Sequence, residues 1–362
     1  MTQIPGNAIA LPGFFVLIYC WPQKQDTVNQ VGPATSRYTV VMQSEPNIIL
    51  SGTDPDLPKN LAPGLGRYTG FRDMAQGGCA TLRSCFDPVA GRTVAIKTLP
   101  PEIRHDRRER RRLLREARVT AQLQHPNTVP VYEIGEDAQQ GVFFVMKRIS
   151  GENLFEILKR IANGDEATTA AFPVLRRIEI VADACQALAY AHARGVIHRD
   201  VKPENIWVGN FGEVILLDWG VAKVWGHADD NEPLGRSVLK SPEQENQQLQ
   251  TLTAGGQRPG TPLYMSPEQV QGNRSLDERS DIFSAGVCLY EVLAIREPFR
   301  GRTIDETFNN IKNLQIDQPS VRSPNRGIPQ KADEVVTRAL QKRPSDRYQS
   351  MREMIAEMRA IE

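Results

Sequence analysis

A short stretch in the second half of the chain brings together side chains that could act on a phosphate group. Residues 198 to 205 read His-Arg-Asp-Val-Lys-Pro-Glu-Asn, so a carboxylate, an amine and an amide stand at positions 200, 202 and 205. A second carboxylate, Asp218, follows 18 residues after the first and precedes Trp219 and Gly220. Phosphoryl transfer needs few covalent participants, because positioning, cations and magnesium around the phosphate oxygens stabilise its loose transition state. Carboxylates, amides and lysines are groups that could serve such a reaction.

Two charged residues upstream complete this set. Lys97 ends the sequence Val-Ala-Ile-Lys, and Glu116 follows 19 residues later in an arginine-rich segment. His-Arg-Asp alone could belong to a surface loop, but several motifs in this order and spacing make a chance match negligible. The order resembles the serine/threonine protein kinase family, in its eukaryotic-like bacterial form, over about residues 68 to 358. The resemblance implies that Lys97 and Glu116 form an ion pair that holds the phosphates of ATP.

The resemblance also implies roles for the polar residues of the two downstream motifs. Asp200 would orient the substrate hydroxyl and accept its proton, while Lys202 would neutralise the transferring phosphate. Asn205 and Asp218 would bind Mg²⁺, or Mn²⁺ in its place. ATP and a divalent cation are therefore the expected cofactors.

The turn expected to cover the phosphates of ATP departs from the family pattern. Its G-x-G-x-x-G frame reads Ala75-Gln-Gly77-Gly78-Cys-Ala80, with two of the three glycines replaced. Glycine lets backbone amides approach phosphates without a Cβ, so the two alanines predict weakened nucleotide affinity. Trp207 stands where the family usually has a smaller apolar side chain beneath the adenine. The nucleotide-binding residues implied by the resemblance are Met74, Ala75, Gln76, Gly77, Gly78, Cys79, Ala80, Thr81, Leu82, Ala95, Lys97, Glu116 and Met146.

Further residues match positions that support the catalytic loop in this family. Asp281 resembles the helix carboxylate that braces the loop, and Arg347 resembles the buried partner of Glu268. Trp219 keeps an aromatic side chain where the family has phenylalanine, so the metal chemistry would survive while the packing adjusts. The structural and regulatory residues implied in this way are His198, Arg199, Trp219, Gly220, Thr253, Thr261, Glu268, Asp281 and Arg347.

A long polar segment, residues 218 to 268, corresponds to the activation segment of the family. An arginine at the position of Arg199 often receives a phosphorylated residue of this segment through charge-assisted hydrogen bonds. Lys202 together with Thr261 implies serine or threonine acceptors rather than tyrosine, so protein substrates and autophosphorylation are expected. Candidate phosphorylation sites are Ser237, Ser241, Thr251 and Thr253.

The elements that must position these residues change in kind along the chain. Short alternating segments from residue 68 to 97 predict antiparallel strands joined by tight turns. Apolar residues at helical spacing predict a helix over residues 101 to 124, and further strands are expected at 129 to 132 and 142 to 147. Beyond residue 150 the pattern is that of long helices, notably over residues 175 to 194.

The predicted fold class is therefore α+β. It is a bilobal protein kinase fold, with a small antiparallel-sheet lobe carrying one main helix, a larger and mostly helical lobe, and a cleft between them. The kinase domain is expected over residues 68 to 359, with the lobes at about 68 to 149 and 150 to 359. Residues 1 to 67 are predicted to be a weakly structured extension, because Pro, Gly, Asn and Ser are frequent there and no helical period is sustained.

The composition of the chain limits which partners and which cellular compartment are expected. The 44 Lys and Arg balance 43 Asp and Glu, so no global field draws the chain to nucleic acid or to a membrane, and eight arginines at 104 to 118 are interpreted as a solvated helix face. Five cysteines without zinc or disulfide spacing predict reduced thiols and a cytoplasmic protein. The longest apolar run, residues 9 to 21, is shorter than the roughly 20 residues of a spanning helix and lacks the basic leader of a signal peptide. Nothing in the sequence indicates an oligomeric state.

Three classes of function stay open at this point. They are a protein kinase, an ATP-binding scaffold of kinase fold without catalysis, and a kinase-like enzyme that acts on a small molecule. Thr261 and Glu268 in the activation segment favour protein substrates. His125 and His192 are interpreted as capping or core histidines, because neither has an acid or a nucleophile near it in the sequence.

Overall fold

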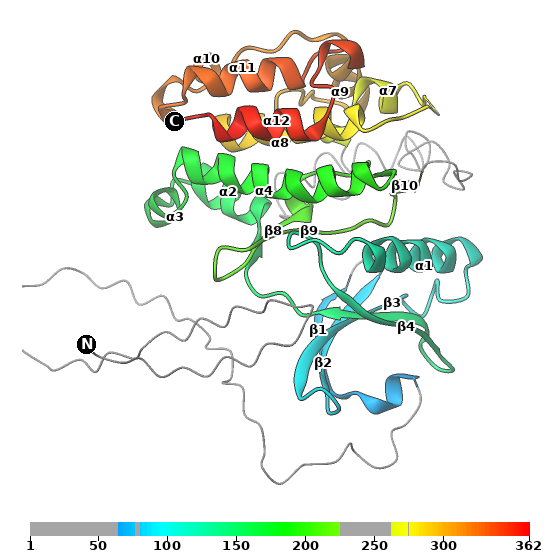
Figure 1. The fold of residues 1–362 in the computed structure, drawn as a ribbon. Coiled ribbons are helices and arrows are strands. Elements are labelled where there is room, and N and C mark those ends of the chain that lie inside the picture. The colour runs from blue at the N-terminus through cyan, green and yellow to red at the C-terminus, as the bar shows by residue number, and fades with distance from the viewer. Residues whose placement is uncertain (1–63, 77–79, 225–261, 274) are drawn as a thin grey trace, which may run out of the picture. The chain divides into compact units, whose positions relative to one another are not determined.

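The computed structural model describes residues 64 to 76, 80 to 224, 262 to 273 and 275 to 362, all within one compact unit, Asp56–Glu362 (Figure 1). A five-stranded antiparallel sheet in the order β1-β2-β3-β5-β4 forms its first part. The strands are β1 (Thr69–Gln76), β2 (Thr81–Asp87), β3 (Arg92–Thr98), β4 (Val131–Asp137) and β5 (Gly141–Lys147). The antiparallel strands predicted between residues 68 and 97 are thereby confirmed.

Both faces of the central strands are covered, which explains why β5 is apolar without alternation. On one face, Phe144 packs with Leu113 and Ala117 of the helix α1 (Arg107–Gln122). On the other face, Phe143 packs with Tyr68, which follows the short helix η1 (Gly64–Arg67). Burial of these side chains is the main force that holds the sheet, the helix and the first described residues together.

The helix α1 begins later than the residue 101 expected from its apolar spacing. Residues 101 to 105 form turns, and Asp106 then caps the helix by accepting hydrogen bonds from the backbone N–H groups of Arg108 and Glu109, at 2.7 and 3.4 Å. A side-chain oxygen that satisfies the first free amides fixes a helix start more strongly than apolar spacing does.

Strand β4 also differs from its expected limits of 129 to 132. It begins at Val131 and continues to Asp137, in register with β5 as far as the pair Asp137 and Gly141. Its side chains alternate between half-buried and exposed, and Glu133, Gly135 and Glu136 are weak strand formers. The ladder with β5 therefore decides the extent of this strand, which its own residues do not indicate.

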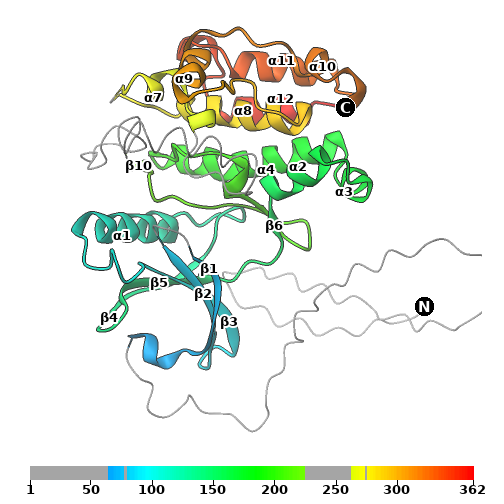
Figure 2. The same cartoon turned by 180° about the vertical axis from the view of Figure 1, so that it is seen from behind.

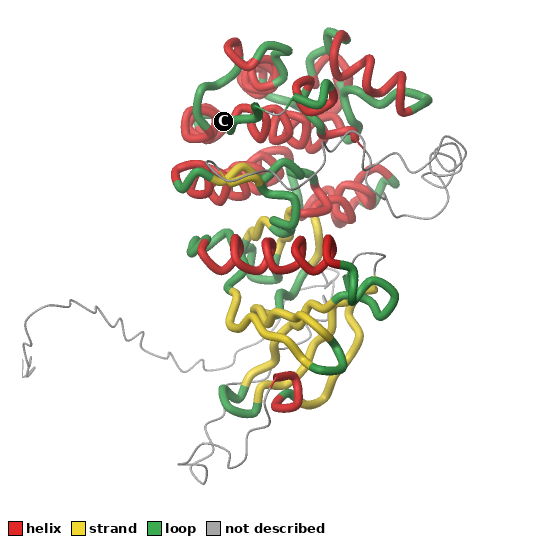
Figure 3. The backbone as a smooth tube through the Cα atoms, turned by 90° about the vertical axis from the view of Figure 1, so that its right-hand side faces the viewer, coloured by secondary structure: helices red, strands yellow, loops and turns green. Residues whose placement is uncertain are grey.

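The second part of the unit is mostly helical, as Figures 1 and 3 show. The helix α8 (Arg279–Ala294) is buried along nearly its whole length, and it contacts α4, α10, α11 and α12 (Figure 2). The helix expected over residues 175 to 194 is confirmed as α4 (Val174–Ala193). The remaining helices are α2 (Leu154–Ala162), α3 (Glu166–Ala171), α7 (Pro267–Val270), α9 (Ile304–Asn313), α10 (Pro319–Arg322), α11 (Gln330–Ala339) and α12 (Met351–Arg359). Within the described ranges, no helix combines the length and the apolar composition needed to cross a membrane.

Two small sheets carry the loops that hold the chemical motifs. One has the order β6-β8-β9 and the other pairs β10 with β7. Residues 198 to 205 lie between β7 and β8, and Asp218 follows β9. Asn127, which precedes β4, makes two hydrogen bonds to β9. Its backbone carbonyl accepts from the N–H of Leu216 at 2.9 Å, and its side-chain amide donates to the carbonyl of Val214 at 2.7 Å. The strands are β6 (Glu152–Asn153), β7 (Val196–Ile197), β8 (Ile206–Val208), β9 (Val214–Leu216) and β10 (Lys223–Val224).

Candidate active site

A lysine of the sheet and a glutamate of the helix form the first ion pair of the site. Lys97, on β3, places its Nζ 2.5 Å from Oε1 of Glu116, on α1. Burial alone would lower the pKa of Lys97, but the negative charges of Glu116 and Asp218 raise it. The lysine therefore keeps its positive charge beside two carboxylates, as a phosphate-binding group must.

The loop after β7 holds a second lysine and carboxylate in direct contact. Nζ of Lys202 lies 2.6 Å from Oδ2 of Asp200. The side-chain amide of Asn205 donates to the backbone carbonyl of Asp200 at 2.8 Å and to its Oδ2 at 3.2 Å. The short helix η2 (Pro203–Asn205) makes this possible, because it turns the chain back so that Asn205 faces the residue five positions before it. The carboxylate of Asp200 is thus held by two donors from its own loop.

The positive charges of Lys97 and Lys202 both act on the carboxylate of Asp218. Asp218 follows β9 with a left-handed backbone φ of 63°, and Oδ1 accepts a hydrogen bond from the N–H of Gly220 at 3.2 Å. Burial alone would raise the pKa of Asp218, but the positive charges of Lys97, Lys202 and Arg112 lower it to about 2. Arg112, on α1, was not singled out from the sequence, where it is one of eight similar arginines.

The donor set around Asp218 fits a magnesium ion only if other ligands join it. Among the described residues, no three His, Cys, Asp or Glu side chains are grouped so that they could hold a metal by themselves. Mg²⁺ is usually bound by one or two carboxylates together with substrate phosphates and water. Asp218 with the amide oxygen of Asn205 suits that mode of binding, in which the nucleotide brings the remaining ligands.

A buried carboxylate of α8 holds residues 198 to 205, the expected catalytic loop, by their backbone. Oδ2 of Asp281 accepts from the backbone N–H of His198, and Oδ1 from that of Arg199, both at 2.8 Å. His192, on α4, lies with Nε2 2.7 Å from Oδ2 of the same carboxylate. Burial alone would raise the pKa of Asp281, but the hydrogen bond and charge of His192 lower it. His192 thus has an acidic partner, Asp281, which the helix α8 supplies from a distant part of the sequence.

The two tryptophans near the site have different surroundings. Trp219 is fully buried and meets the ring of His198 edge-on, with ring centroids 4.5 Å apart. Its side chain therefore packs on the catalytic loop. Trp207, on β8, donates from its indole N–H to the carbonyl of Ser150 at 3.0 Å. That bond fixes one edge of the Trp207 ring beside β6.

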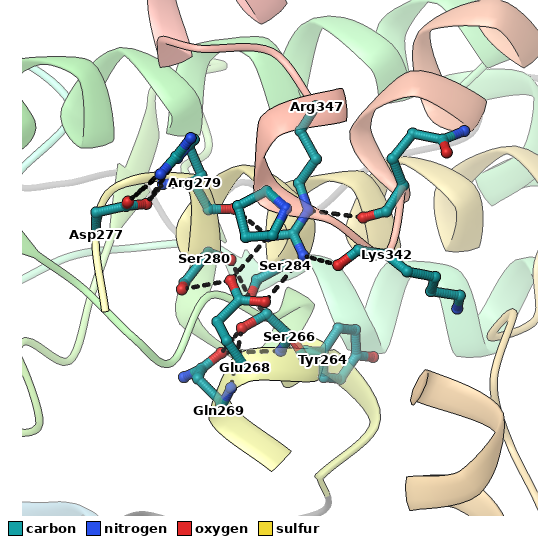
Figure 4. A network of polar contacts seen from close by, with 12 residues as sticks. Tyr264, Ser266, Glu268, Gln269, Asp277, Arg279, Ser280, Ser284, Lys342 and Arg347 are labelled. Atoms are coloured by element: carbon teal, nitrogen blue, oxygen red, sulfur yellow. Dashed lines mark hydrogen bonds and ion pairs between the residues drawn. The ribbon is translucent and has the colours of Figure 1, made fainter. Parts of the chain in front are cut away.

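A bidentate ion pair links α7 to the segment before α12. The guanidinium of Arg347 donates to Oε1 and Oε2 of Glu268 at 2.8 and 2.9 Å, and Ser280 donates to Oε1 at 2.7 Å (Figure 4). Burial alone would raise the pKa of Glu268, but its hydrogen bonds and the charge of Arg347 lower it. The partnership of Glu268 with Arg347 that the resemblance implied is present.

Most of the described residues predicted to bind the nucleotide lie on four strands of the sheet, β1, β2, β3 and β5. Ala95, on β3, is opposite Met146 on β5, and Leu82, on β2, is opposite Lys97. Met74 and Thr81 lie on β1 and β2, which precede and follow residues 77 to 79 in the chain. Ala75 and Gln76 end β1 and pair with Leu82 and Thr81, and Ala80 precedes β2. The site residues and proposed acceptors outside the described part of the chain are Gly77, Gly78, Cys79, Ser237, Ser241, Thr251, Thr253 and Thr261.

A family model for the protein kinase domain matches residues 68–358. The chain belongs to the protein kinase family. This match, with the five-stranded sheet and the helices that follow it, confirms the expected bilobal α+β kinase fold.

Serine/threonine-protein kinase PknD of Protochlamydia amoebophila is 32% identical over 308 residues, which are 83% of this chain and 31% of the relative. PknD of Chlamydia caviae is 33% identical over 300 residues, which are 81% of this chain and 31% of the relative. This kinase-family chain thus spans less than a third of the length of these bacterial relatives.

Proposed function

We propose that this chain transfers the γ-phosphoryl group of ATP to serine and threonine hydroxyls of proteins, including its own. The observation that carries the proposal is that two lysines from separate parts of the fold both act electrostatically on Asp218. Lys97 comes from the sheet and Lys202 from the catalytic loop, and the charge of each lowers the pKa of Asp218. Two cations around one metal-binding carboxylate are what the phosphates of a nucleotide and a divalent ion require.

The described residues suggest how the transfer would proceed. Asp200 would orient the incoming hydroxyl and accept its proton, while Asn205 and Lys202 keep the carboxylate in position. Lys97 would bind the phosphates, with Glu116 setting its direction. When bound beside Asn205 and Asp218, Mg²⁺ would neutralise charge on the phosphate oxygens. Lys202 would stabilise the negative charge of the transferring group.

These intact pairs favour catalysis over the alternative of an inactive nucleotide-binding scaffold. A scaffold would not need both Lys202 and Asn205 bonded to Asp200. The names of the relatives support serine and threonine acceptors on proteins. We place the kinase domain at residues 68 to 359, after an extension over residues 1 to 67, with an activation segment at 218 to 268. We place the activity in the cytoplasm, where ATP is available.

Incorporation of labelled phosphate into a generic protein substrate, with ATP and Mg²⁺, tests the proposal. The Asp200→Asn variant keeps the size of the side chain but cannot accept the proton, so incorporation should fall by roughly 10²- to 10⁴-fold. Undiminished incorporation by this variant would reject the assignment of Asp200. Nucleotide binding by the wild-type chain without any incorporation would reject the enzyme and support the scaffold.

A further inference from the structure

The residue immediately before Asp200 is held in a conformation that needs outside support. Arg199 has a left-handed backbone φ of 69°, which is costly for a residue with a Cβ. Its N–H donates to Asp281, and Nε of its side chain donates to the carbonyl of Val221 at 2.6 Å. Its own carbonyl accepts a hydrogen bond from Nε2 of Gln269, on α7, at 3.0 Å. The backbone that leads into Asp200 is thus fixed on both sides of Arg199, by two different helices.

The amide of Gln269 can be oriented in only one way. Its Oε1 accepts from the backbone N–H and the hydroxyl of Ser266, at 2.9 and 3.1 Å. Its Nε2 faces the carbonyl of Arg199, which can only accept. The side chain is almost fully buried, so water does not substitute for either partner. Gln269 therefore connects the start of α7 to the catalytic loop through one donor and one acceptor.

The neighbouring residue anchors α7 in the helical part of the fold. Glu268 is held by Arg347 and Ser280, and Figure 4 shows this pair beside Ser266 and Gln269. The position of Gln269 therefore follows from a buried network and not from surface contacts. A shift of α7 would be transmitted to the carbonyl of Arg199 through a single amide.

We propose that Gln269 is a positioning residue for Asp200: by holding the Arg199 carbonyl, it keeps the catalytic carboxylate in reach of the substrate hydroxyl. This inference rests on the proposed kinase function. Gln269 has no described hydrogen bond to Lys97 or Asp218, so its loss should act on Asp200 more directly than on the nucleotide side of the site. Loss of the amide should therefore reduce kcat without changing the KM for ATP.

The test compares two variants of Gln269 with a matched control on the same helix. Gln269→Glu keeps the shape and the bonds from Ser266 but faces the Arg199 carbonyl with an oxygen, and Gln269→Met removes the donor without adding charge. Because small displacements of a catalytic group are expensive, kcat should fall roughly 10- to 100-fold in both variants. The dissociation constant for ATP, measured directly, should stay within about twofold of the wild type and report an intact fold.

Ser266→Ala is the control, because it removes the hydroxyl that caps α7 and one of the two donors to Oε1 of Gln269, but leaves the other donor, the backbone N–H of Ser266, and the bond from Gln269 to Arg199. It should lower the melting temperature while kcat stays within about twofold of the wild type. An unchanged kcat in both Gln269 variants, or an equal loss in Ser266→Ala, would overturn the inference. So would a loss that appears only in the KM for ATP. Absence of activity in the wild type would instead reject the proposed function.

Discussion

Asp281, on α8, lies within 2.7 Å of Nε2 of His192, on α4, although 89 residues separate the two in the chain. The same carboxylate accepts the backbone N–H groups of His198 and Arg199, so it joins two buried helices to the catalytic loop. One side chain thus carries both a packing contact between helices and the position of the loop that contains Asp200.

Asp281→Asn, compared with His192→Phe, should separate the contact between the helices from the support of the loop. The amide keeps one acceptor oxygen but turns an NH₂ group toward donors, so at least one buried N–H loses its partner. Each lost partner costs about 1–3 kcal/mol, and unfolding in urea should show a fall in stability of that size. Phosphate incorporation should fall as well, because the loop is no longer fixed. His192→Phe, which removes only the contact between the helices, is the matched control and should retain more of the activity than Asp281→Asn.

Stability should depend on pH through Asp218. Its pKa is lowered from 3.8 to about 2 in the folded chain. The folded state therefore binds fewer protons than the unfolded state, so the stabilising contribution is complete above about pH 4 and is lost as the pH falls toward 2. At 1.36 kcal/mol per pKa unit, the contribution is at most roughly 2 kcal/mol.

The Asp218→Asn variant provides the check on this pH dependence. The free energy of unfolding is measured for both chains at pH 5 and pH 3. The wild type should lose more stability between these two values than the variant does, since the variant has no carboxylate to protonate at this position. Equal losses in both chains would show that Asp218 does not contribute in this pH range.

Breaking the pair of Glu268 and Arg347 should be among the most destabilising single changes. Arg347 is fully buried and its guanidinium matches both carboxylate oxygens. Arg347→Met leaves the carboxylate of Glu268 without its counter-charge, which costs about 3–5 kcal/mol. The double variant with Glu268→Gln should be less destabilised than the two single changes added together, as measured by urea unfolding. Strict additivity would contradict the coupling.

A methyl group at position 220 should disturb the proposed magnesium site at Asp218 without unfolding the chain. A Cβ on Gly220 would lie 3.1 Å from Oδ1 of Asp218 and 3.4 Å from Oε2 of Glu116. In Gly220→Ala the carboxylate of Asp218 must therefore move by a few tenths of an ångström. The concentration of Mg²⁺ needed for half-maximal incorporation should rise, while the melting temperature changes by only a few degrees. An unchanged Mg²⁺ requirement would show that Asp218 tolerates the displacement.

The order of the motifs was enough to predict the fold class and the main pairs of the site. Lys97 with Glu116, and Asp200 with Lys202 and Asn205, could be identified because their residue types, order and spacing resemble the motifs of the kinase family. The limits of β4 could not be predicted from the sequence, because its pairing with β5 overrides the weak strand preference of its own residues.

The sequence by itself indicated which residues could take part in phosphoryl transfer, because their types and their order along the chain resemble those of the kinase family. Only the tertiary structure decided how they are supported. His192 meets Asp281, Gln269 meets the carbonyl of Arg199, and Arg112 comes near Asp218, each through the packing of elements remote in the chain. Such contacts depend on how buried helices fit together, and no local pattern encodes that fit.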